Sequence, residues 1–289
     1  MKIEGGLLPL KKDKRDFTVG AAFQLPKLED LPKTFSLGES KILDQNYDGN
    51  YDECLSYATV GGSRFQDGVD MYPQYHFAAS KDISGDVEGF GQDLRTGMKA
   101  WTIYACAEVS DIPQEIKDLP PAQQRYLSVY PDRVINAAKL NIKPTYFSVE
   151  GKYDAYDNIR ASLYAFRHLK QVVYVGVMWR WDLNEYILKM KPGNFFGHCM
   201  YVKGWDEDGL ITVNSAGEWA GQRGEHRLTR EVVNNDVPIF GAFMLTDIPR
   251  EEAEKRLKEN MTQQISIIQK IINLWLELKK KLWVKQQTQ

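Results

Sequence analysis

Hydrophobic residues recur at helical spacing through the first half of the chain. In residues 93–105 the apolar side chains Leu94, Met98 and Trp101 are separated by steps of four and three, the period of one helix face. Similar patterns predict helices over the ranges Cys54–Phe65, Tyr72–Ala79, Asp93–Ala105, Asp132–Leu140 and Asp157–Leu169. Residues 1–45 show little periodicity and contain several prolines, which indicates an extended segment before the first helix.

The pattern changes to that of strands after residue 170. Gln171–Met178 is rich in β-branched residues, and Ile239–Leu245 is a second apolar run of strand length. Between them, two more apolar runs, Cys199–Trp205 and Leu210–Val213, lie next to each other. They flank the acidic turn Asp206–Gly209, which predicts a hairpin. Helices followed by strands predict an α+β protein with segregated helical and β-rich parts.

A further amphipathic pattern follows Pro249. Residues 251–285 predict a helix about 50 Å long. Two neighbouring apolar stripes run along it: Met261, Ile265, Ile268, Ile272, Trp275 and Leu282, and beside them Ile267, Ile271, Leu274 and Leu278. So wide a surface favours a homo-oligomer or docking to a larger assembly, with packing back on the domain or lying on a membrane surface as alternatives. The charged stretch Arg250–Lys258 is predicted to be a solvated spacer.

Charge and composition exclude several classes of protein. The 289 residues include 37 basic and 39 acidic side chains, a net charge of −2, so we expect no nucleic-acid partner. No stretch has the ~18 uncharged apolar residues of a transmembrane segment, and Met1–Arg15 lacks the apolar run of a signal peptide. The three scattered cysteines predict no disulfide framework, and no histidine has metal-ligand spacing, so we expect no metal or other cofactor. We expect a cytoplasmic or virion-associated location.

His198 and Asn214 lie at the two ends of the predicted hairpin. The acidic turn is midway between them, so they should face each other to within about two or three residues. An amide oxygen that accepts the Nδ1 proton of an imidazole leaves Nε2 free to take a proton from a nucleophile. A lone histidine is more often structural, but here a cysteine far upstream supplies a third partner.

That partner is Cys54, at a loop-to-helix junction preceded by the turn-prone Asp48-Gly49-Asn50. The positive end of a helix dipole and a neighbouring imidazolium both lower a thiol pKa, which predicts a resting thiolate–imidazolium pair for acyl transfer. A cysteine at a helix start is by itself more often structural. The other two cysteines, Cys106 and Cys199, are predicted to be buried small hydrophobic residues.

Short motifs surround these residues in a consistent order. They are Asp13–Phe17, Leu31-Pro32, Asp44-Gln45, Gly91–Arg95, Ala105–Glu108, Gly197-His198-Cys199, and Asn214–Gly217 with Gly221 and Gly224. His198 follows Cys54 by 144 residues (198 − 54), and Asn214 follows His198 by 16 (214 − 198). Together they resemble the papain-like cysteine peptidases (the C1 family) over roughly residues 5–248, and above all the bacterial and viral members that lack a long propeptide.

The resemblance implies an α+β papain-like fold of two lobes with a cleft between them. Residues 1–44 would form the extended N-terminal segment, 45–150 a mainly helical lobe and 151–249 a mainly β lobe, with 250–289 as the appended helix. The implied activity is hydrolysis of peptide bonds, in a peptide or protein substrate, through an acyl-enzyme on Cys54.

The resemblance also implies roles for four more residues. The side-chain amide of Gln45, with the backbone N–H of Cys54, would stabilise the oxyanion of the transition state. Three glycines, Gly89, Gly91 and Gly197, would form the walls of the cleft that receive the substrate backbone.

Three departures from the family pattern favour an alternative function. The gap of nine residues between Gln45 and Cys54 (54 − 45) is longer than usual. Glu53 and Leu55 flank Cys54 where a small residue and an aromatic residue are usual, and an inward-pointing Glu53 would raise the thiol pKa. Ala216 replaces a tryptophan that shields the His–Asn pair, although Trp219 is near enough to substitute. The alternative is a weak or inactive papain-like module with a structural or binding role, in a virus particle for example.

Overall fold

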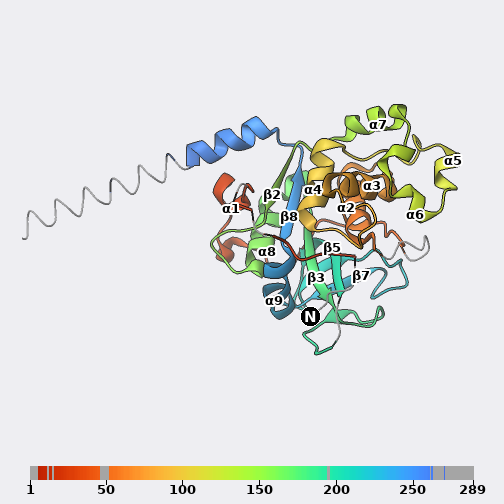
Figure 1. Cartoon of the computed structure of the whole chain (residues 1–289). Coiled ribbons are helices and arrows are strands. Elements are labelled where there is room, and N and C mark those ends of the chain that lie inside the picture. The colour runs from red at the N-terminus through yellow and green to blue at the C-terminus, as the bar shows by residue number, and fades with distance from the viewer. Residues whose placement is uncertain are drawn as a thin grey trace, which may run out of the picture.

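The chain folds into a group of helices packed against one large twisted sheet (Figure 1). The computed structural model describes residues 6–11, 13–14, 16–45, 52–193, 196–260, 262 and 270. The helices on the right of Figure 1 are α2 (Cys54–Asp67), α3 (Pro73–Ser84), α4 (Leu94–Ile103), α5 (Gln114–Lys117), α6 (Pro121–Gln124) and α7 (Asp132–Ala138). They include the predicted helices of residues 54–140, and α4 has Asp93 as its N-cap.

The sheet has eight strands, in the order β2-β8-β3-β5-β6-β7-β4, with β1 paired to β5. The strands are β1 (Phe35–Ser36), β2 (Thr145–Ser148), β3 (Val173–Trp179), β4 (Ile187–Leu188), β5 (Phe196–Trp205), β6 (Leu210–Val213), β7 (Glu225–Leu228) and β8 (Ala242–Thr246). Among the pairs of named strands in the described part of the chain, only β4 and β7 run parallel. The predicted hairpin is confirmed: β5 and β6 pair antiparallel, with Tyr201 opposite Val213.

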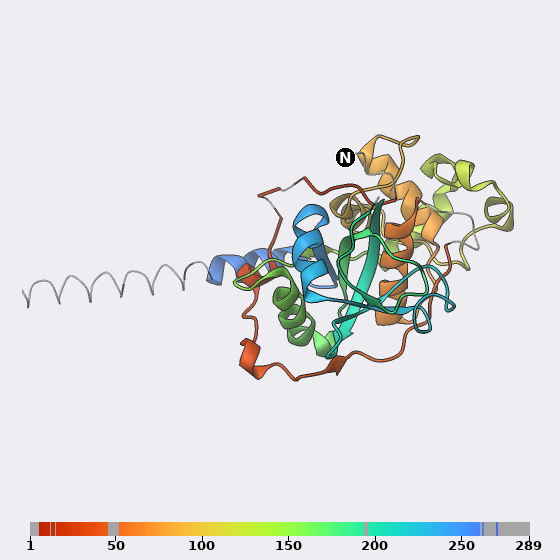
Figure 2. The ribbon, with the colours of Figure 1, turned by 90° about the horizontal axis from the view of Figure 1, so that it is seen from below.

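Both faces of the sheet are covered by helices. Along β3 the side chains alternate, so Tyr174 belongs to the core beneath α2, whereas Val173 and Val175 belong to a second core. That second core is closed by α8 (Ala155–Ala165) and α9 (Arg230–Phe240). Figure 2 shows α2 in orange on one side of the sheet, and α8 in green with α9 in blue on the other.

The strand prediction over Ile239–Leu245 is wrong at its start. Ile239 and Phe240 end α9, and the strand β8 begins only at Ala242. Gly241, with φ of +91°, separates the two elements in a backbone conformation that favours glycine. An apolar run alone does not distinguish the end of a buried helix from the start of a buried strand.

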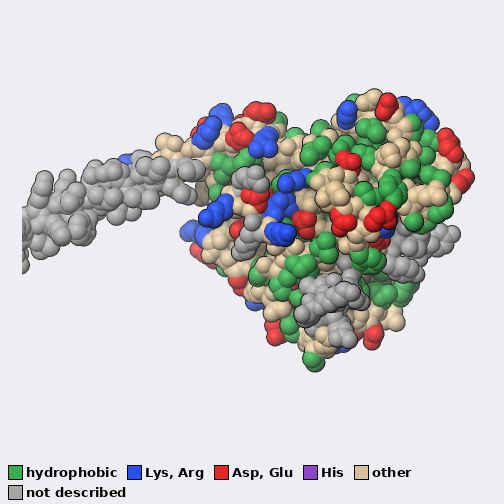
Figure 3. All heavy atoms as spheres, in the orientation of Figure 1, with side chains coloured by type: hydrophobic (Ala, Val, Ile, Leu, Met, Phe, Trp, Pro, Cys, Tyr) green, Lys and Arg blue, Asp and Glu red, His purple; other side chains and the backbone are tan. Residues whose placement is uncertain are grey.

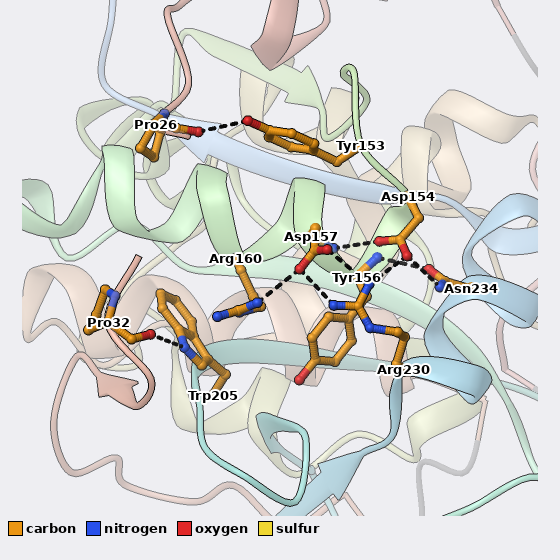
Figure 4. Close-up of polar contacts among 10 residues, drawn as sticks. All are labelled: Pro26, Pro32, Tyr153, Asp154, Tyr156, Asp157, Arg160, Trp205, Arg230 and Asn234. Atoms are coloured by element: carbon orange, nitrogen blue, oxygen red, sulfur yellow. Dashed lines mark hydrogen bonds and ion pairs between the residues drawn. The ribbon is translucent and has the colours of Figure 1, made fainter. Parts of the chain in front are cut away.

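The N-terminal segment wraps around the outside of the β-rich side. It carries the short helices α1 (Val19–Ala22) and η1 (Leu28–Asp30). Backbone carbonyls of this segment accept side-chain hydrogen bonds: Tyr153 donates to Pro26 at 3.2 Å and Trp205 donates to Pro32 at 3.1 Å (Figure 4). These contacts fasten an otherwise extended segment to the loop before α8 and to β5.

A charged network in the same view joins α8 to α9. Arg230 lies 2.6 Å from a carboxylate oxygen of Asp154 and 2.9 Å from one of Asp157, and its guanidinium stacks over Tyr156 (Figure 4). Asn234 donates to Asp154 at 2.9 Å. Asp154 is also the N-cap of α8, so the same carboxylate caps the start of α8 and links this helix to α9.

The start of the C-terminal segment packs on the domain, so the prediction of a solvated spacer is wrong. Residues 250–260 are helical, and Ala253 is fully buried in the second core. The guanidinium of Arg256 lies over the ring of Phe23, and Asn260 donates to the backbone oxygens of Ala21 and Ala22 at 3.0 Å. The two apolar stripes, and with them the predictions of an oligomer, larger assembly or membrane contact, lie outside the described residues.

The surface carries both signs of charge. Acidic and basic side chains intermingle over the face shown in Figure 3, in keeping with the net charge of −2. Among the helices of the described ranges, none has both the length and the apolar character needed to cross a membrane.

Close packing of α2 on the sheet gives a test of the core. A Cβ atom added at Gly62 would lie 2.6 Å from Cε1 of Tyr174 and 2.9 Å from Cγ2 of Val172. We expect Gly62→Ala to lower the free energy of unfolding by about 1–3 kcal/mol, because overpacking outweighs the gain in helix propensity. At Gly61 the nearest atom is Cε1 of Tyr201, at 3.2 Å, so Gly61→Ala is the matched control. Urea unfolding that finds Gly62→Ala as stable as Gly61→Ala contradicts this packing.

His76 is a buried imidazole that connects three helices. Its Nδ1 lies 3.0 Å from the Ser56 hydroxyl and its Nε2 lies 3.1 Å from the Gly97 carbonyl oxygen. Since a carbonyl oxygen only accepts, Nε2 carries the proton and Ser56 donates to Nδ1. Burial lowers the pKa of His76 to about 4, so this side chain stays neutral when the folded protein is mildly acidified.

The free energy of unfolding should therefore fall as the pH drops from about 6.5 towards 4. In that window an unfolded His76 binds a proton and the folded one does not, which contributes a slope of up to about 1.4 kcal/mol per pH unit. His76→Gln can keep both hydrogen bonds and should reduce the slope in urea titrations at several pH values. The control is His168→Gln, at an exposed position. Equal slopes for wild type and His76→Gln would contradict the assignment.

Candidate active site

Cys54 is the first residue of α2, where the helix meets the sheet. Its side chain is 1% exposed. The sulfur accepts hydrogen bonds from the backbone N–H groups of Cys199, on β5, and Leu55. The thiol thus lies at a helix N-terminus, as predicted. The packing of α2 on β5 places it beside Cys199, the residue that follows His198 in the chain.

His198 and Asn214 are brought together by the hairpin. His198 lies on β5 and Asn214 directly follows β6, and Nε2 of the imidazole lies 2.8 Å from Oδ1 of the amide. The prediction of contact is confirmed, but the predicted ring nitrogen is wrong. Nε2 bonds the amide, so Nδ1 is the nitrogen that remains for the nucleophile.

The orientation of the Asn214 amide follows from a backbone group. The N–H of Ser215 donates to Oδ1 at 2.7 Å, and an N–H can only donate, so this atom is the oxygen. His198 must then donate its Nε2 proton to the same oxygen. The neutral imidazole consequently carries its lone pair on Nδ1, which is the form that a general base requires.

An aromatic side chain that the sequence analysis did not single out covers the His–Asn pair. The ring of Trp179, on β3, meets that of His198 edge-on with centroids 5.1 Å apart. Trp179 is 6% exposed, whereas Trp219 is 56% exposed. Trp179, on β3, is thus a ring that the structure places against His198, whereas substitution by Trp219 stays a prediction.

Gln45 lies beside the same block of residues. Its backbone N–H donates to the Ser215 carbonyl at 2.8 Å, and the Ser215 hydroxyl donates to its side-chain oxygen at 2.5 Å. The side chain is buried, and the preceding Asp44 forms a bridge with Ala216. Because Oε1 is held by Ser215, the amide N–H groups are the part of Gln45 that can meet an oxyanion. The longer loop between Gln45 and Cys54 falls mostly outside the described residues.

Gly89 and Gly91 are held by a buried lysine. The ammonium of Lys81, whose residue is 1% exposed, donates to the carbonyl oxygens of Gly89 at 2.5 Å and Gly91 at 2.7 Å. Gly91 has φ of +68°, a conformation that favours glycine. Lys81 thus fixes the loop that leads into Gln92.

The chain's own N-terminal residues lie between this loop and β5. Leu7 donates its N–H to the carbonyl of Gly197 at 3.0 Å. The backbone N–H of Gln92 donates to the carbonyl oxygen of Gly6 at 3.0 Å, and the carbonyl oxygen of Gln92 accepts from the N–H of Leu8 at 2.8 Å. Residues 6–8 thus form a parallel β-bridge with Gln92. Gly197 has no room for a side chain, because a Cβ atom there would overlap the backbone carbonyl of Leu7. Gly197 and the residue after Gly91 thus bracket an extended piece of peptide, whereas Gly89 is held by Lys81.

This N-terminal segment covers Cys54. A Cβ atom on Gly6 would lie 2.9 Å from the Cys54 sulfur and 2.9 Å from the Asp52 carbonyl oxygen. The Leu7 side chain is fully buried and lies against Gly176 and Phe240. Residues 6–8 therefore pack over Cys54, whose thiol is buried.

Burial determines the charge states of the site. It raises the pKa of the Cys54 thiol to about 12, with the backbone N–H groups of Cys199 and Leu55 acting in the opposite direction and the Asp52 carboxylate raising it further. Burial lowers the pKa of His198 to about 4, against the hydrogen bond that the ring donates to Asn214, which raises it. Both groups are neutral near pH 7, so the expected thiolate–imidazolium pair is wrong for this covered state.

The two acidic residues before Cys54, Asp52 and Glu53, interact with residues of the helical part of the protein. The carboxylate of Asp52 lies 3.0 Å from the guanidinium of Arg125. Glu53 is 2% exposed, and its charge acts on Lys81 and Tyr130. Asp52, and not Glu53, is thus the carboxylate that raises the thiol pKa.

The other two cysteines are confirmed as buried small residues, since Cys106 and Cys199 are both fully buried. Within the described ranges, no three histidine, cysteine or acidic side chains are grouped as metal ligands. Cys54, His198, Asn214 and Gln45 can supply a thiol, an imidazole and amide hydrogen-bond donors.

Comparison with solved structures identifies the fold. Xylellain, a cysteine protease from Xylella fastidiosa, superposes with a TM-score of 0.67 at 16% identity, over 86% of this chain and 98% of that one. A procathepsin B from Trypanosoma congolense gives 0.56 at 13% identity, over 84% of this chain and 85% of that one. A cysteine protease from Carica candamarcensis, in complex with E-64, gives 0.52 at 13% identity, over 75% of this chain and 100% of that one. No family model matches the sequence, and no curated protein matches it either.

The chain therefore has the papain-like α+β fold of cysteine proteases, and the fold expected from the sequence is confirmed. Identities of 13–16% establish this fold and no more.

Proposed function

We propose that the protein is a cysteine peptidase that hydrolyses peptide bonds through an acyl-enzyme on Cys54. One observation carries the proposal. An extended peptide, residues 6–8 of the chain itself, lies in the cleft with its backbone bonded to Gln92 and Gly197 and with Gly6 against the Cys54 sulfur. A peptide substrate held by the same backbone groups would have its carbonyl carbon within reach of that sulfur.

The first half of the reaction uses the geometry of His198. Its Nδ1 takes the proton of the Cys54 thiol, and the sulfur forms a bond to the carbonyl carbon of the substrate while the C=O electron pair moves to oxygen. The backbone N–H of Cys54 and the side-chain amide of Gln45 donate to that oxyanion. Loss of one such donor typically lowers the rate by about a hundred- to a thousandfold.

The second half of the reaction regenerates the thiol. The imidazolium of His198 returns its Nδ1 proton to the leaving amine as the C–N bond breaks, which leaves a thioester on Cys54. Nδ1 then takes a proton from water, whose oxygen attacks the thioester carbon. The C–S bond breaks to release the carboxylic acid, and the imidazolium returns its Nδ1 proton to the Cys54 sulfur. Asn214 holds the other nitrogen throughout, so the ring stays in the tautomer that both steps need.

The pocket filled by Leu7 indicates the class of substrate. It is lined by Leu94 and Phe240, with Gly176 leaving space at its base. A pocket of this composition holds a bulky aliphatic side chain by burying apolar surface. We therefore propose peptides with a leucine-like residue at the position that Leu7 occupies.

The alternative function is an inactive papain-like module. The long Gln45–Cys54 loop and Ala216 are the departures that motivate it. Trp179 supplies the cover that Ala216 lacks, and the burial of Cys54 comes from a segment that a local change can displace. Neither feature favours the alternative over a covered peptidase.

An epoxysuccinyl inhibitor distinguishes the two, and Leu7→Asp is the background in which to use it. A peptidase should gain one inhibitor molecule, mapped to Cys54, and none at Cys106 or Cys199. His198→Ala in the same background should abolish the labelling, because epoxide opening needs the thiolate and a proton donor. Equal labelling of all three cysteines, or none of Cys54 in folded protein, supports the inactive module.

A further inference from the structure

His226 is a buried histidine directly behind the His198–Asn214 pair. It lies on β7, is fully buried and meets the same ring of Trp179 edge-on, with centroids 5.6 Å apart. Its Nε2 lies 3.2 Å from Nδ2 of Asn214, and its Nδ1 lies 2.7 Å from the backbone oxygen of Glu185. None of the steps of the proposed reaction uses this imidazole.

Elementary hydrogen-bond chemistry fixes the tautomer of His226. The carbonyl oxygen of Glu185 only accepts, so Nδ1 of His226 carries the proton. Its Nε2 is then a lone pair, and it accepts an N–H of the Asn214 amide. The Ser215 N–H holds the oxygen of that amide. The amide of Asn214 is therefore held at both ends, and rotating it would place donors against donors and acceptors against acceptors.

We propose that His226 is a positioning residue that locks the Asn214 amide, so that His198 keeps its proton on Nε2 and presents the Nδ1 lone pair to Cys54. The kinetic consequence rests on the proposed peptidase function. The tautomer of His198 does not, because it follows from the hydrogen bonds alone.

The surroundings of His226 keep it neutral and in place. Burial lowers its pKa, with the Glu185 carbonyl acting in the opposite direction and the positive charge of Arg227 lowering it further. A protonated ring would turn its Nε2 into a donor facing the amide N–H groups, so neutrality is required. Gly221 lies against the ring, where a Cβ atom would be 2.7 Å from Cε1 of His226, and the hydrogen bonds to Asn214 and Glu185 hold the imidazole in this orientation.

Two substitutions at one position test the inference. His226→Phe keeps an aromatic ring and loses both hydrogen bonds, whereas His226→Gln can accept from Asn214 and donate to Glu185 without ever carrying a charge. Nitrogen-15 NMR of histidine-labelled protein reports the tautomer of His198 directly. The kinetic readout is kcat and KM on a peptide ester in the Leu7→Asp background, with circular dichroism confirming that each variant is folded.

We expect His226→Phe to lower kcat by about ten- to a hundredfold and to leave KM within about twofold of the parent. This loss of rate is a part of what general acid–base catalysis by His198 contributes. Its His198 signal should shift from the Nε2–H form towards a mixture of tautomers. His226→Gln should restore kcat to within about threefold of the parent and restore the Nε2–H form.

Three results are decisive. A folded His226→Phe with parental kcat and an unchanged His198 tautomer overturns the inference. Equal impairment of the two variants with an unchanged tautomer also overturns it, since that is what loss of packing would produce. If peptide and ester turnover are absent even in the Leu7→Asp parent, the proposed function fails. The tautomer shift in His226→Phe, reversed in His226→Gln, then still supports the positioning role.

Discussion

Displacing residues 6–8 from the cleft should raise the rate at which Cys54 is alkylated by at least about a hundredfold at about pH 7.5. The reason is the thiolate fraction. Burial holds the pKa of Cys54 at about 12, whereas an uncovered cysteine titrates near 8.5, and Gly6 is packed against the sulfur. Each unit by which the pKa falls gives about ten times more thiolate, and the attacking reagent also gains access.

Two variants displace the segment by different means. Leu7→Asp places a carboxylate in a pocket lined by Leu94 and Phe240, where an unpaired charge is not tolerated. Gly6→Val adds a branched side chain where even a Cβ atom would lie 2.9 Å from the Cys54 sulfur. Lys11→Ala, at an exposed position of the same segment, is the matched control and should react like wild type. Iodoacetamide kinetics followed by peptide mapping measure the rates. A wild-type rate in both displaced variants would mean that the segment does not govern the thiol.

Loss of the imidazole should have the largest effect on turnover. In the Leu7→Asp background, His198→Ala should lower kcat/KM on a peptide substrate by about a thousand- to ten-thousandfold, because the thiol loses its base and the leaving amine loses its acid. Asn214→Ala should be milder, about ten- to a hundredfold, and should act on kcat more than on KM because the amide orients the ring and contacts no substrate.

His168→Ala is the control for this pair, since His168 is exposed and distant in the chain from the hairpin. The pH dependence of kcat/KM supplies a second readout, because the change in rate that comes from titration of the His198 imidazole should disappear in His198→Ala. Near-parental turnover of a peptide ester by folded His198→Ala would remove this residue from the mechanism.

The sequence predicts the His–Asn pair because a hairpin leaves little freedom. The acidic turn Asp206–Gly209 is flanked by two apolar runs, and antiparallel pairing then forces His198 and Asn214 to within reach of each other. The structure places Tyr201 opposite Val213, so Asn214 lies across from the neighbourhood of His198, as expected. The α4 helix is equally predictable, because Asp93 supplies a cap ahead of a regular apolar stripe.

The helix α9 was missed because its sequence argues locally against a helix. Asn234, Asn235 and Asp236 compete for backbone hydrogen bonds, and Pro238 lies inside the helix. Tertiary contacts outweigh these preferences: Asp236 is fully buried, forms an ion pair with Arg180 and accepts from the backbone of Met178. Short motifs carry no information about such long-range partners.

The cover over Cys54 had no signal in the sequence for a related reason. Gly6 and Leu7 are ordinary residues in an aperiodic segment, and only the pairing with Gln92 and Gly197 gives them a role. The predicted thiolate–imidazolium pair assumed a solvated cleft, so the missed cover and the wrong charge state have one cause. The sequence does not predict a role for Trp179 or His226, because each reaches the site from a different strand, β3 or β7, and only the sheet brings them together.

Turnover of a mixed peptide library by the Leu7→Asp protein decides whether Cys54 is the nucleophile of a peptidase. We expect peptide cleavage, enriched for leucine-like residues at the position that Leu7 occupies, and complete loss of cleavage when Cys54→Ser is added to the same protein. No cleavage by folded Leu7→Asp protein whose Cys54 reacts readily with iodoacetamide, or equal cleavage with and without Cys54, would contradict it.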